Sequence, residues 1–284
     1  MYNNTARVLI SCRDRKGLSA AVTSFISENR GNIVHLDQHV DFEQNTFFLR
    51  AEWELNEFRL SREELPGAIA DFARAYEMEW SLHLSDDRTR TAVFVSKQAH
   101  CLYDILSRHE AGELRMEIPL IVSNHEDLAE VARRFDIPFF VFPVTAENKR
   151  KQEQAELELL HAHDIQLIVL ARYMQIVSPL LISHYRNRII NIHHSFLPAF
   201  PGARPYHSAH KRGVKIIGAT SHYVTEELDA GPIIEQDVIH VSHQDSVQDF
   251  IRRGRDLEKI VLARAIWRHL EHRIIVYNDK TVTF

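Results

Sequence analysis

The short polar stretch Ser85-Asp86-Asp87-Arg88-Thr89-Arg90 divides the chain into two parts whose hydrophobic patterns differ. Exposed polar segments of this kind are typical of the linkers between domains. We therefore predict a first domain over residues 1–85, a linker over residues 86–90 and a second domain over residues 91–284. A chain of 284 residues is long enough for each part to bury a core of its own.

The first part has a strand–helix–strand–strand–helix–strand pattern. Short β-prone runs alternate with segments in which apolar residues recur every three or four positions. The polar sequence Phe42-Glu43-Gln44-Asn45 separates two of the β-prone runs and suits a hairpin. Ser61, followed three residues later by Glu64, forms a capping box at the start of the second helix. This order predicts a ferredoxin-like βαββαβ fold.

In the second part, β-prone runs and helical patterns alternate one by one. The run 165–171 is apolar almost throughout, which is typical of a strand buried on both faces. Such alternation predicts a doubly wound, mostly parallel sheet with helices on both sides. A helical pattern over residues 246–273 predicts a long helix near the end of the chain. The predicted class is therefore α/β throughout.

Composition and simple motifs exclude several kinds of chemistry. The chain has 18 histidines but only 9 glycines, and it contains no Gly-x-Gly-x-x-Gly and no complete P-loop. It also lacks the His-Glu-x-x-His of zinc proteases and the Gly-x-Ser-x-Gly of serine hydrolases. We therefore expect neither a nucleotide site, nor a metal site, nor a resident cofactor.

Charge and hydropathy limit the partners and the location. The net charge is −5 and no long basic block occurs, which argues against nucleic-acid binding. No segment approaches the ~18 apolar residues of a membrane span, and no long apolar run opens the chain. We expect a cytoplasmic protein that binds neither nucleic acid nor membranes.

The strongest chemical signal lies between Asn191 and Asp229. Asn191 and His193 follow an apolar run, at the carboxyl end of a predicted parallel strand, where α/β sheets bind ligands. They are two residues apart, so both side chains project from one face of an extended chain. An amide donor beside an imidazole suits acyl transfer, since one group holds an oxyanion and the other moves protons. Asp229 lies in a turn and could orient the imidazole or the attacking water.

Each of these residues also has an ordinary structural explanation. Asn191 and His193 could be a strand-end cap and a buried, hydrogen-bonded histidine. An aspartate near glycine, such as Asp229, is common turn chemistry.

The motifs around these residues resemble a known family. The sequence Asn191-Ile192-His193 through Ser195, Leu197 and Pro198, then Gly202, together with Leu228-Asp229-x-Gly231-Pro232, is similar to the catalytic pattern of folate-dependent formyltransferases. The resemblance runs from Thr91 to the C-terminus. It implies that Asn191, His193 and Asp229 form the active site and that 10-formyltetrahydrofolate supplies the one-carbon group.

The resemblance also implies where the folate binds. In that family a loop after a central strand holds the pterin largely by backbone hydrogen bonds, and a second turn lies on its other side. The matching residues in this chain are Arg172, Tyr173, Met174, Gln175, Ile176 and Val177, then Glu226, Glu227 and Leu228. The alternative from the residues alone is a strand end with Met174 and Ile176 in the core.

The first part resembles an ACT domain, a small ferredoxin-like regulatory module. An ACT domain ahead of a formyltransferase-like domain is the arrangement of hydrolases that convert 10-formyltetrahydrofolate to tetrahydrofolate and formate. Such an activity supplies formate for purine biosynthesis and balances one-carbon pools. The resemblance also implies glycine and methionine as opposing effectors, and a homo-oligomer, a dimer or a tetramer, in which paired ACT domains bind the amino acid. The residues that match the ACT turn and second strand are Asp14, Lys16, Gly17, Leu18, Asn32 and Ile33.

One departure from the transferases favours hydrolysis. Glycinamide ribonucleotide formyltransferase, which the second part resembles, has a Gly/Ser/Asn-rich loop that cradles the substrate phosphate. Here the corresponding segment is Val95-Ser96-Lys97-Gln98-Ala99-His100-Cys101, which contains no glycine. Without a bound amine acceptor, water is the remaining nucleophile. Two alternatives stay open: a transferase that passes the formyl group to an amine, and a non-catalytic amino-acid sensor.

Overall fold

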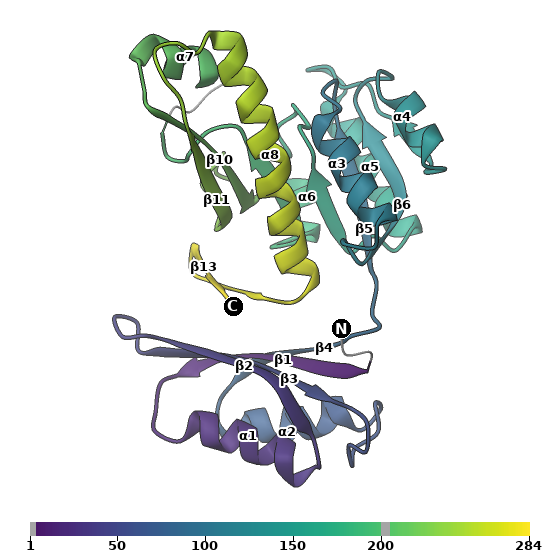
Figure 1. Ribbon diagram of the computed structural model, residues 1–284. Coiled ribbons are helices and arrows are strands. Elements are labelled where there is room, and N and C mark those ends of the chain that lie inside the picture. Colours follow the sequence, from purple (N-terminus) through teal and green to yellow (C-terminus); the bar gives the residue numbers. More distant parts are fainter. Residues whose placement is uncertain (1–3, 200–204) are drawn as a thin grey trace. The chain divides into compact units, whose positions relative to one another are not determined.

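The computed structural model describes residues 4–199 and 205–284, and the chain separates into two units close to the polar stretch (Figure 1). The first unit comprises Met1–Asp87 with two short C-terminal pieces, Glu271–Tyr277 and Thr281–Phe284. The second comprises Arg88–Leu270 with Asn278–Lys280.

The first unit has the predicted βαββαβ order. Its four-stranded antiparallel sheet has the order β2-β3-β1-β4, so the first and third strands pair at the centre. Apolar residues at every fourth position of the first helix, Leu18, Val22 and Ile26, pack against alternate residues of β1 such as Val8 and Ile10. The elements are β1 (Thr5–Arg13), α1 (Leu18–Glu28), β2 (Asn32–Asp41), β3 (Thr46–Glu54), α2 (Leu65–Ala75) and β4 (Glu79–Leu84).

The end of the chain differs from the sequence prediction. The long helix α8 (Val247–Leu270) ends three residues before the predicted position, and two short strands follow, β12 (Ile274–Tyr277) and β13 (Lys280–Thr283). Most of this segment belongs to the first unit, whereas the sequence pattern placed it in a second domain over residues 91–284.

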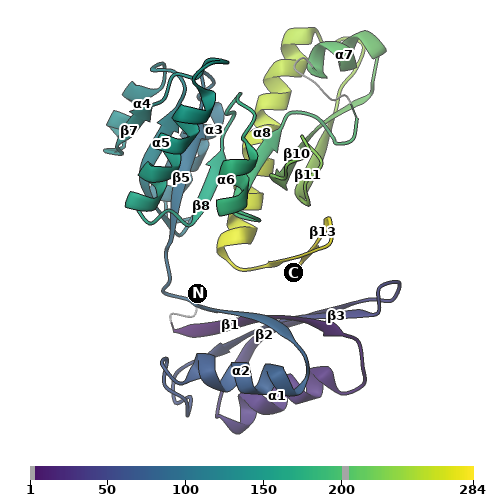
Figure 2. The ribbon, with the colours of Figure 1, turned by 180° about the vertical axis from the view of Figure 1, so that it is seen from behind.

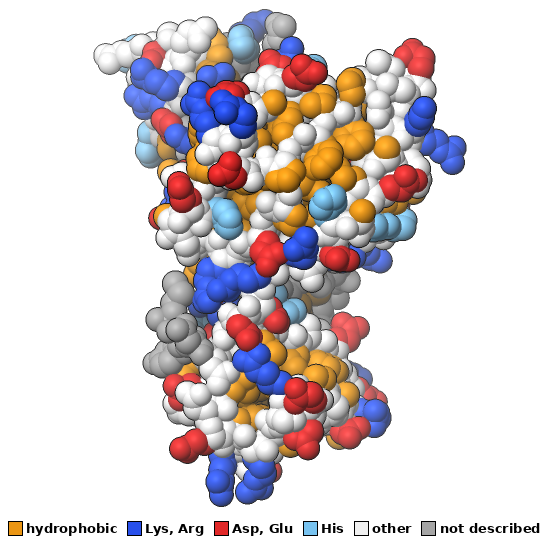
Figure 3. Space-filling model, turned by 90° about the vertical axis from the view of Figure 1, so that its right-hand side faces the viewer, with side chains coloured by type: hydrophobic (Ala, Val, Ile, Leu, Met, Phe, Trp, Pro, Cys, Tyr) orange, Lys and Arg blue, Asp and Glu red, His pale blue; other side chains and the backbone are white. Residues whose placement is uncertain are grey.

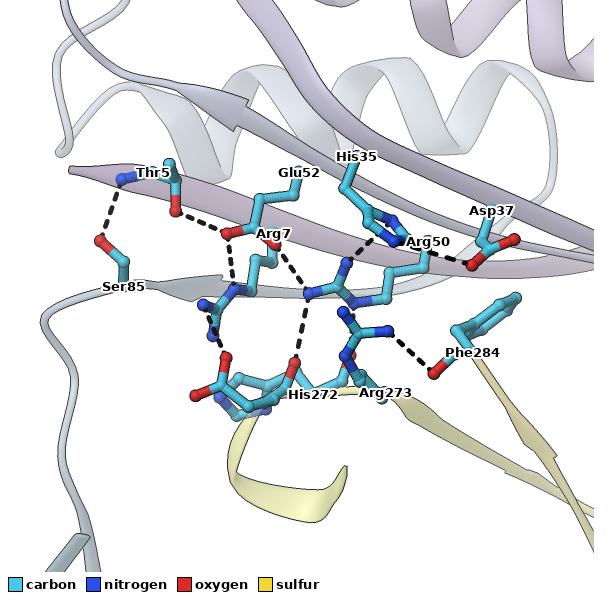
Figure 4. A network of polar contacts seen from close by, with 11 residues as sticks. Thr5, Arg7, His35, Asp37, Arg50, Glu52, Ser85, His272, Arg273 and Phe284 are labelled. Atoms are coloured by element: carbon cyan, nitrogen blue, oxygen red, sulfur yellow. Dashed lines mark hydrogen bonds and ion pairs between the residues drawn. The ribbon is translucent and has the colours of Figure 1, made fainter. Parts of the chain in front are cut away.

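Buried arginines in the first sheet explain why the C-terminal segment after α8 packs against this sheet. Arg50 is 0% exposed in the middle of β3, and its Nε atom donates to the carbonyl oxygen of His272 at 3.0 Å. Arg7 forms an ion pair of 2.9 Å with Glu271, and both arginines contact Glu52 (Figure 4). His272 has a φ of +48°, a left-handed conformation that ends the helical path. A sheet face with buried guanidinium groups needs these acceptors.

The second unit contains a seven-stranded sheet with the order β11-β10-β9-β8-β5-β6-β7. The five neighbouring strands β9-β8-β5-β6-β7 run parallel to one another. Strand β10 pairs antiparallel with β9 and with β11, so the sheet is mostly parallel, as predicted. The remaining elements are β5 (Thr89–Val95), α3 (His100–Glu110), β6 (Met116–Ser123), α4 (Ala129–Arg134), β7 (Phe139–Val141), α5 (Lys149–Ala162), β8 (Leu167–Leu170), α6 (Pro179–His184), β9 (Ile189–His193), α7 (Pro205–Arg212), β10 (Ile216–Tyr223) and β11 (Ile233–His240).

Helices cover both faces of this sheet. Helices α3 and α8 lie on one face, and α5 and α6 lie on the other, which Figure 2 shows from behind. The strand order reverses between β5 and β8, which is the switch point where sheets of this kind bind ligands. The two short helices α6 and α7 were not predicted, because neither shows two full turns of apolar periodicity. Among the helices in residues 4–199 and 205–284, none is both long and apolar enough to span a membrane.

Candidate active site

Asn191 and His193 lie at the carboxyl end of β9, as predicted. Strand β10 pairs with this end, and the register places His222 opposite Asn191 and Thr220 opposite His193. Cross-strand partners share one face of a sheet, so the imidazole of His222 lies beside the amide of Asn191. The distance from Asn191 Nδ2 to His222 Nε2 is 3.2 Å.

The turn after β10 carries Asp229 back to this strand end. Asp229 has a φ of +57°, and Tyr223 N–H donates to the carbonyl of Pro232 at 2.9 Å, which closes the turn against β10. A Cβ atom on Gly231 would lie 1.8 Å from the carbonyl oxygen of Tyr223. The close approach of the two backbone segments therefore requires glycine at this position.

The turn places the Asp229 carboxylate between two imidazoles. Asp229 Oδ2 lies 3.2 Å from His193 Nδ1, and Oδ1 lies 3.8 Å from His222 Nε2. The hydrogen bond from His193 lowers the pKa of Asp229 far below its ordinary value. The carboxylate is therefore ionised at neutral pH, and it holds His193 with a proton on Nδ1.

His222 is the residue that sequence reasoning missed. It is 2% exposed, and its Nδ1 lies 2.9 Å from the carbonyl oxygen of Tyr223. A carbonyl only accepts, so Nδ1 carries the proton and Nε2 accepts from the amide of Asn191. Only the antiparallel register of β9 and β10 could have revealed this contact, because 31 residues separate the two side chains.

A cavity of about 400 Å³ opens beside these residues. One wall is the loop from Arg172 to Val177, and another includes Glu226 and Leu228. Three large apolar side chains in these walls stand exposed, with fractions of 52% for Met174, 60% for Ile176 and 64% for Leu228. Of the residues predicted to bind folate, Glu227 alone is not part of the cavity lining.

Two predicted loop residues turn their polar ends into the protein interior. The guanidinium of Arg172 lies 3.5 Å from Glu258 on α8, and the hydroxyl of Tyr173 donates to Glu156 on α5 at 3.3 Å. Both residues still border the cavity. The polar ends of Arg172 and Tyr173 therefore anchor the loop, and Met174 and Ile176 present apolar groups to the cavity.

The glycine-free segment after β5 supports the same loop. The hydroxyl of Ser96 donates to Asn124 Oδ1 at 2.6 Å and accepts the backbone N–H of Met174 at 3.0 Å. Gly202, which belongs to the motif of the resemblance, lies outside the described residues.

The predicted effector residues fall into two groups within the first unit. Asp14 N–H donates to the carbonyl of Asn45, next to the start of β3, and Gly17 has a φ of +91° before α1. Asn32 instead pairs with Glu54, at the far end of β3. At about 3.3 Å per residue, this strand separates the groups by roughly 26 Å. One chain therefore does not bring these residues into a single pocket.

Charges are mixed on the molecular face shown in Figure 3. Among the side chains described there, lysines and arginines are interspersed with aspartates and glutamates, without a continuous basic area. A basic area of that kind is the usual mark of nucleic-acid binding.

Comparisons with known proteins agree with this architecture. Residues 89–266 match the formyl transferase family, and residues 6–53 match the ACT domain. A formyltetrahydrofolate deformylase from Synechocystis sp. is 57% identical over 100% of both chains. The crystal structure of a formyltetrahydrofolate deformylase from Pseudomonas syringae matches with a TM-score of 0.96 and 44% identity, covering 99% of this chain and 94% of that one. Glycinamide ribonucleotide transformylase 1 from Symbiobacterium toebii gives a TM-score of 0.67 at 30% identity, covering 72% of this chain and 98% of that one.

The fold and the site thus define an enzyme of the formyl transferase type that carries an ACT domain. The similarity to the deformylases extends over the whole length of the chain. The chain belongs to the formyltetrahydrofolate deformylase family.

Proposed function

We propose that this enzyme hydrolyses 10-formyltetrahydrofolate to tetrahydrofolate and formate at the cavity beside Asn191, His193 and Asp229. The observation that carries the proposal is the 3.2 Å contact between His193 and an ionised Asp229, with the Asn191 amide on the same strand end. In the proposed complex, the loop 172–177 and the turn at Glu226–Leu228 hold the pterin between them.

Water is the nucleophile in the proposed reaction. It attacks the formyl carbon and loses a proton to His193 Nε2, a nitrogen to which no group in the described residues forms a hydrogen bond. The carbonyl oxygen becomes an oxyanion that accepts from the Asn191 amide. His193 returns the proton to N10 of the folate, the C–N bond breaks, and formate leaves. Every role falls to a side chain or to water, so the proposal includes no metal and no resident cofactor.

The test is formate release from 10-formyltetrahydrofolate. Removal of one oxyanion donor typically costs about 3 kcal/mol, so Asn191→Ala should lower kcat at least about a hundredfold. Asp229→Asn should lower it by a similar or larger factor, because the amide can no longer stabilise the His193 cation. Asn148→Ala, at the start of α5 and outside the cavity lining, is the control. Wild-type turnover in the Asn191 or Asp229 variant would refute the assignment.

A formyltransferase would share these residues and differ in its acceptor. It would release little formate until an amine was supplied, whereas the proposed hydrolase releases one formate per tetrahydrofolate without any amine. Measuring both products with and without an added amine therefore separates the two functions.

We also propose that glycine and methionine act through the ACT domain as opposing effectors, in a cytoplasmic homo-oligomer, a dimer or a tetramer. The distance between the two groups of predicted effector residues supports sites composed from two chains, with Asp14–Leu18 from one and Asn32–Ile33 from the other. Calorimetry of the full chain with each amino acid, together with its mass in solution, tests this part. No heat with either amino acid would contradict it.

A further inference from the structure

Helix α8 carries a buried carboxylate that the proposed reaction does not use. Glu258 is 1% exposed and accepts hydrogen bonds from Tyr206 at 2.6 Å and from His100 at 2.8 Å. The guanidinium of Arg172, itself 7% exposed, lies 3.5 Å from the same carboxylate. Glu258 therefore connects α7, the start of α3 and the loop that lines the cavity.

The three partners of Glu258 keep its carboxylate in the charged form. Burial opposes ionisation of Glu258, but the hydrogen bond from His100, the charge of Arg172 and the hydroxyl of Tyr206 lower its pKa below the ordinary value. A buried carboxylate without such partners would be strongly destabilising. Cys101 lies close enough to complete a trio of possible metal ligands with His100 and Glu258. Both carboxylate oxygens are already engaged, and the neighbouring cation is Arg172.

Arg172 also has an unusual backbone. Its φ is +64°, in the left-handed region that non-glycine residues seldom adopt. The chain turns at this residue from β8 into the loop 172–177. Strained conformations persist only where the surroundings hold them. The one charged partner of the Arg172 side chain among the described residues is Glu258.

We infer that Glu258 is a positioning residue for folate, which acts by anchoring Arg172 so that the loop 172–177 keeps its shape. The inference rests on the proposed function, because it assumes that this loop holds the pterin. Glu258, Tyr206 and His100 do not line the cavity, whereas Arg172 does, so the inferred effect passes through Arg172. Loss of the anchor weakens binding of the folate and leaves the chemistry at His193 largely intact.

The first experiment replaces the charge without changing the shape. Glu258→Gln should raise KM for 10-formyltetrahydrofolate about tenfold and change kcat by less than about twofold. The dissociation constant of tetrahydrofolate, which has no formyl group to react, should rise by a similar factor. Asp256→Asn removes an exposed carboxylate from the same helix and should leave all three constants unchanged. An unchanged KM in Glu258→Gln, or a fall in kcat alone, would overturn the inference.

A second pair of variants isolates the backbone conformation and does not depend on Glu258→Gln being folded. Arg172→Ala and Arg172→Gly remove the same guanidinium, but only glycine adopts a left-handed φ without strain. Arg172→Ala should therefore raise KM several-fold more than Arg172→Gly. In the Arg172→Gly background, Glu258→Gln should have no further effect on KM. Equal KM values for the two Arg172 variants would show that the anchor does not act through the loop shape.

A further pair of variants tests whether the proposed folate site is correct, separately from the role of Glu258. Met174→Ala and Ile176→Ala remove exposed apolar groups from the same loop. If neither weakens tetrahydrofolate binding, the proposed folate site is wrong and the inference fails with it. If both weaken binding and Glu258→Gln does not, only the role of Glu258 is wrong.

Discussion

Glu156 on α5 should make the stability of the second unit depend on pH around neutrality. This carboxyl is 1% exposed and contacts the hydroxyl of Tyr173 at the start of the loop 172–177. Burial, followed by the charge of Glu153, raises the pKa of Glu156 to about 7 from the ordinary 4.5. A raised pKa means that the folded state binds the proton more tightly than the unfolded state. The resulting stability is fully present below pH 4.5 and is lost as the pH rises through about 7.

The magnitude follows from that shift. The full difference of 7 − 4.5 = 2.5 units corresponds to about 3 kcal/mol at about 1.36 kcal/mol per unit. Raising the pH from 6 to 8 crosses the folded pKa and removes about 1.4 kcal/mol of this stability. For a domain of this size that is a change in Tm of about 3 to 6 °C.

Glu156→Gln stays neutral at every pH and isolates this contribution. The Tm of the variant minus that of the wild type should be about 3 to 6 °C more positive at pH 8 than at pH 6. Subtraction removes the pH dependence of all other groups. Glu158→Gln, which alters an exposed carboxylate on the same helix, should show the same Tm difference at both pH values. A pH-independent difference for Glu156→Gln would refute the reasoning, because it would show that Glu156 is already ionised at pH 6 in the folded state.

Three further outcomes are expected from the geometry. His222→Leu removes the acceptor that orients the Asn191 amide, so kcat should fall about tenfold with KM nearly constant, and an unchanged kcat would remove His222 from the site. Gly231→Ala places a Cβ against the Tyr223 carbonyl and shifts Asp229, so formate release should fall more than about a hundredfold while the circular dichroism spectrum is retained. Arg50→Met removes one of the donors to Glu52 and leaves the carbonyls of Glu271 and His272 without the Arg50 guanidinium, so it should lower the free energy of unfolding of the first unit by about 3 kcal/mol, measured in urea, and should expose the C-terminal segment to proteolysis.

The sequence predicted the parts of the site that local patterns encode. The alternation Asn191-x-His193 at a strand end, and the position of Asp229 in a turn, are local features, and the structure brings these residues together. His222 and Glu258 are not encoded locally. His222 reaches Asn191 only through strand pairing, and Glu258 lies in a helix whose pattern treats it as an ordinary polar position. Their partners come from distant segments, so no window of the sequence contains the reason for their burial.

In the fold, too, the features that local patterns encode were predicted, and those that depend on long-range contacts were not. The βαββαβ order and the mostly parallel sheet follow from periodicities that single segments carry. The helical pattern of the sequence continues past Leu270, whereas in the structure α8 ends there and most of the following segment belongs to the first unit. Directly after the helix, Glu271 and His272 provide acceptors for Arg7 and Arg50, which lie more than two hundred residues earlier in the chain.

These long-range contacts bear on why water can be the nucleophile. The resemblance to glycinamide ribonucleotide formyltransferase implies that, in that enzyme, a Gly/Ser/Asn-rich loop after the first strand cradles a substrate phosphate. Here the hydroxyl of Ser96, at the start of that segment, holds the backbone of Met174, and His100, at its end, is hydrogen-bonded to the buried Glu258. The polar side chains of Ser96 and His100 in this segment are therefore bonded to other protein groups. The glycine-free segment and the loop 172–177 thus belong to one arrangement, in which Ser96 holds the backbone of Met174 and His100 holds Glu258, the partner of Arg172.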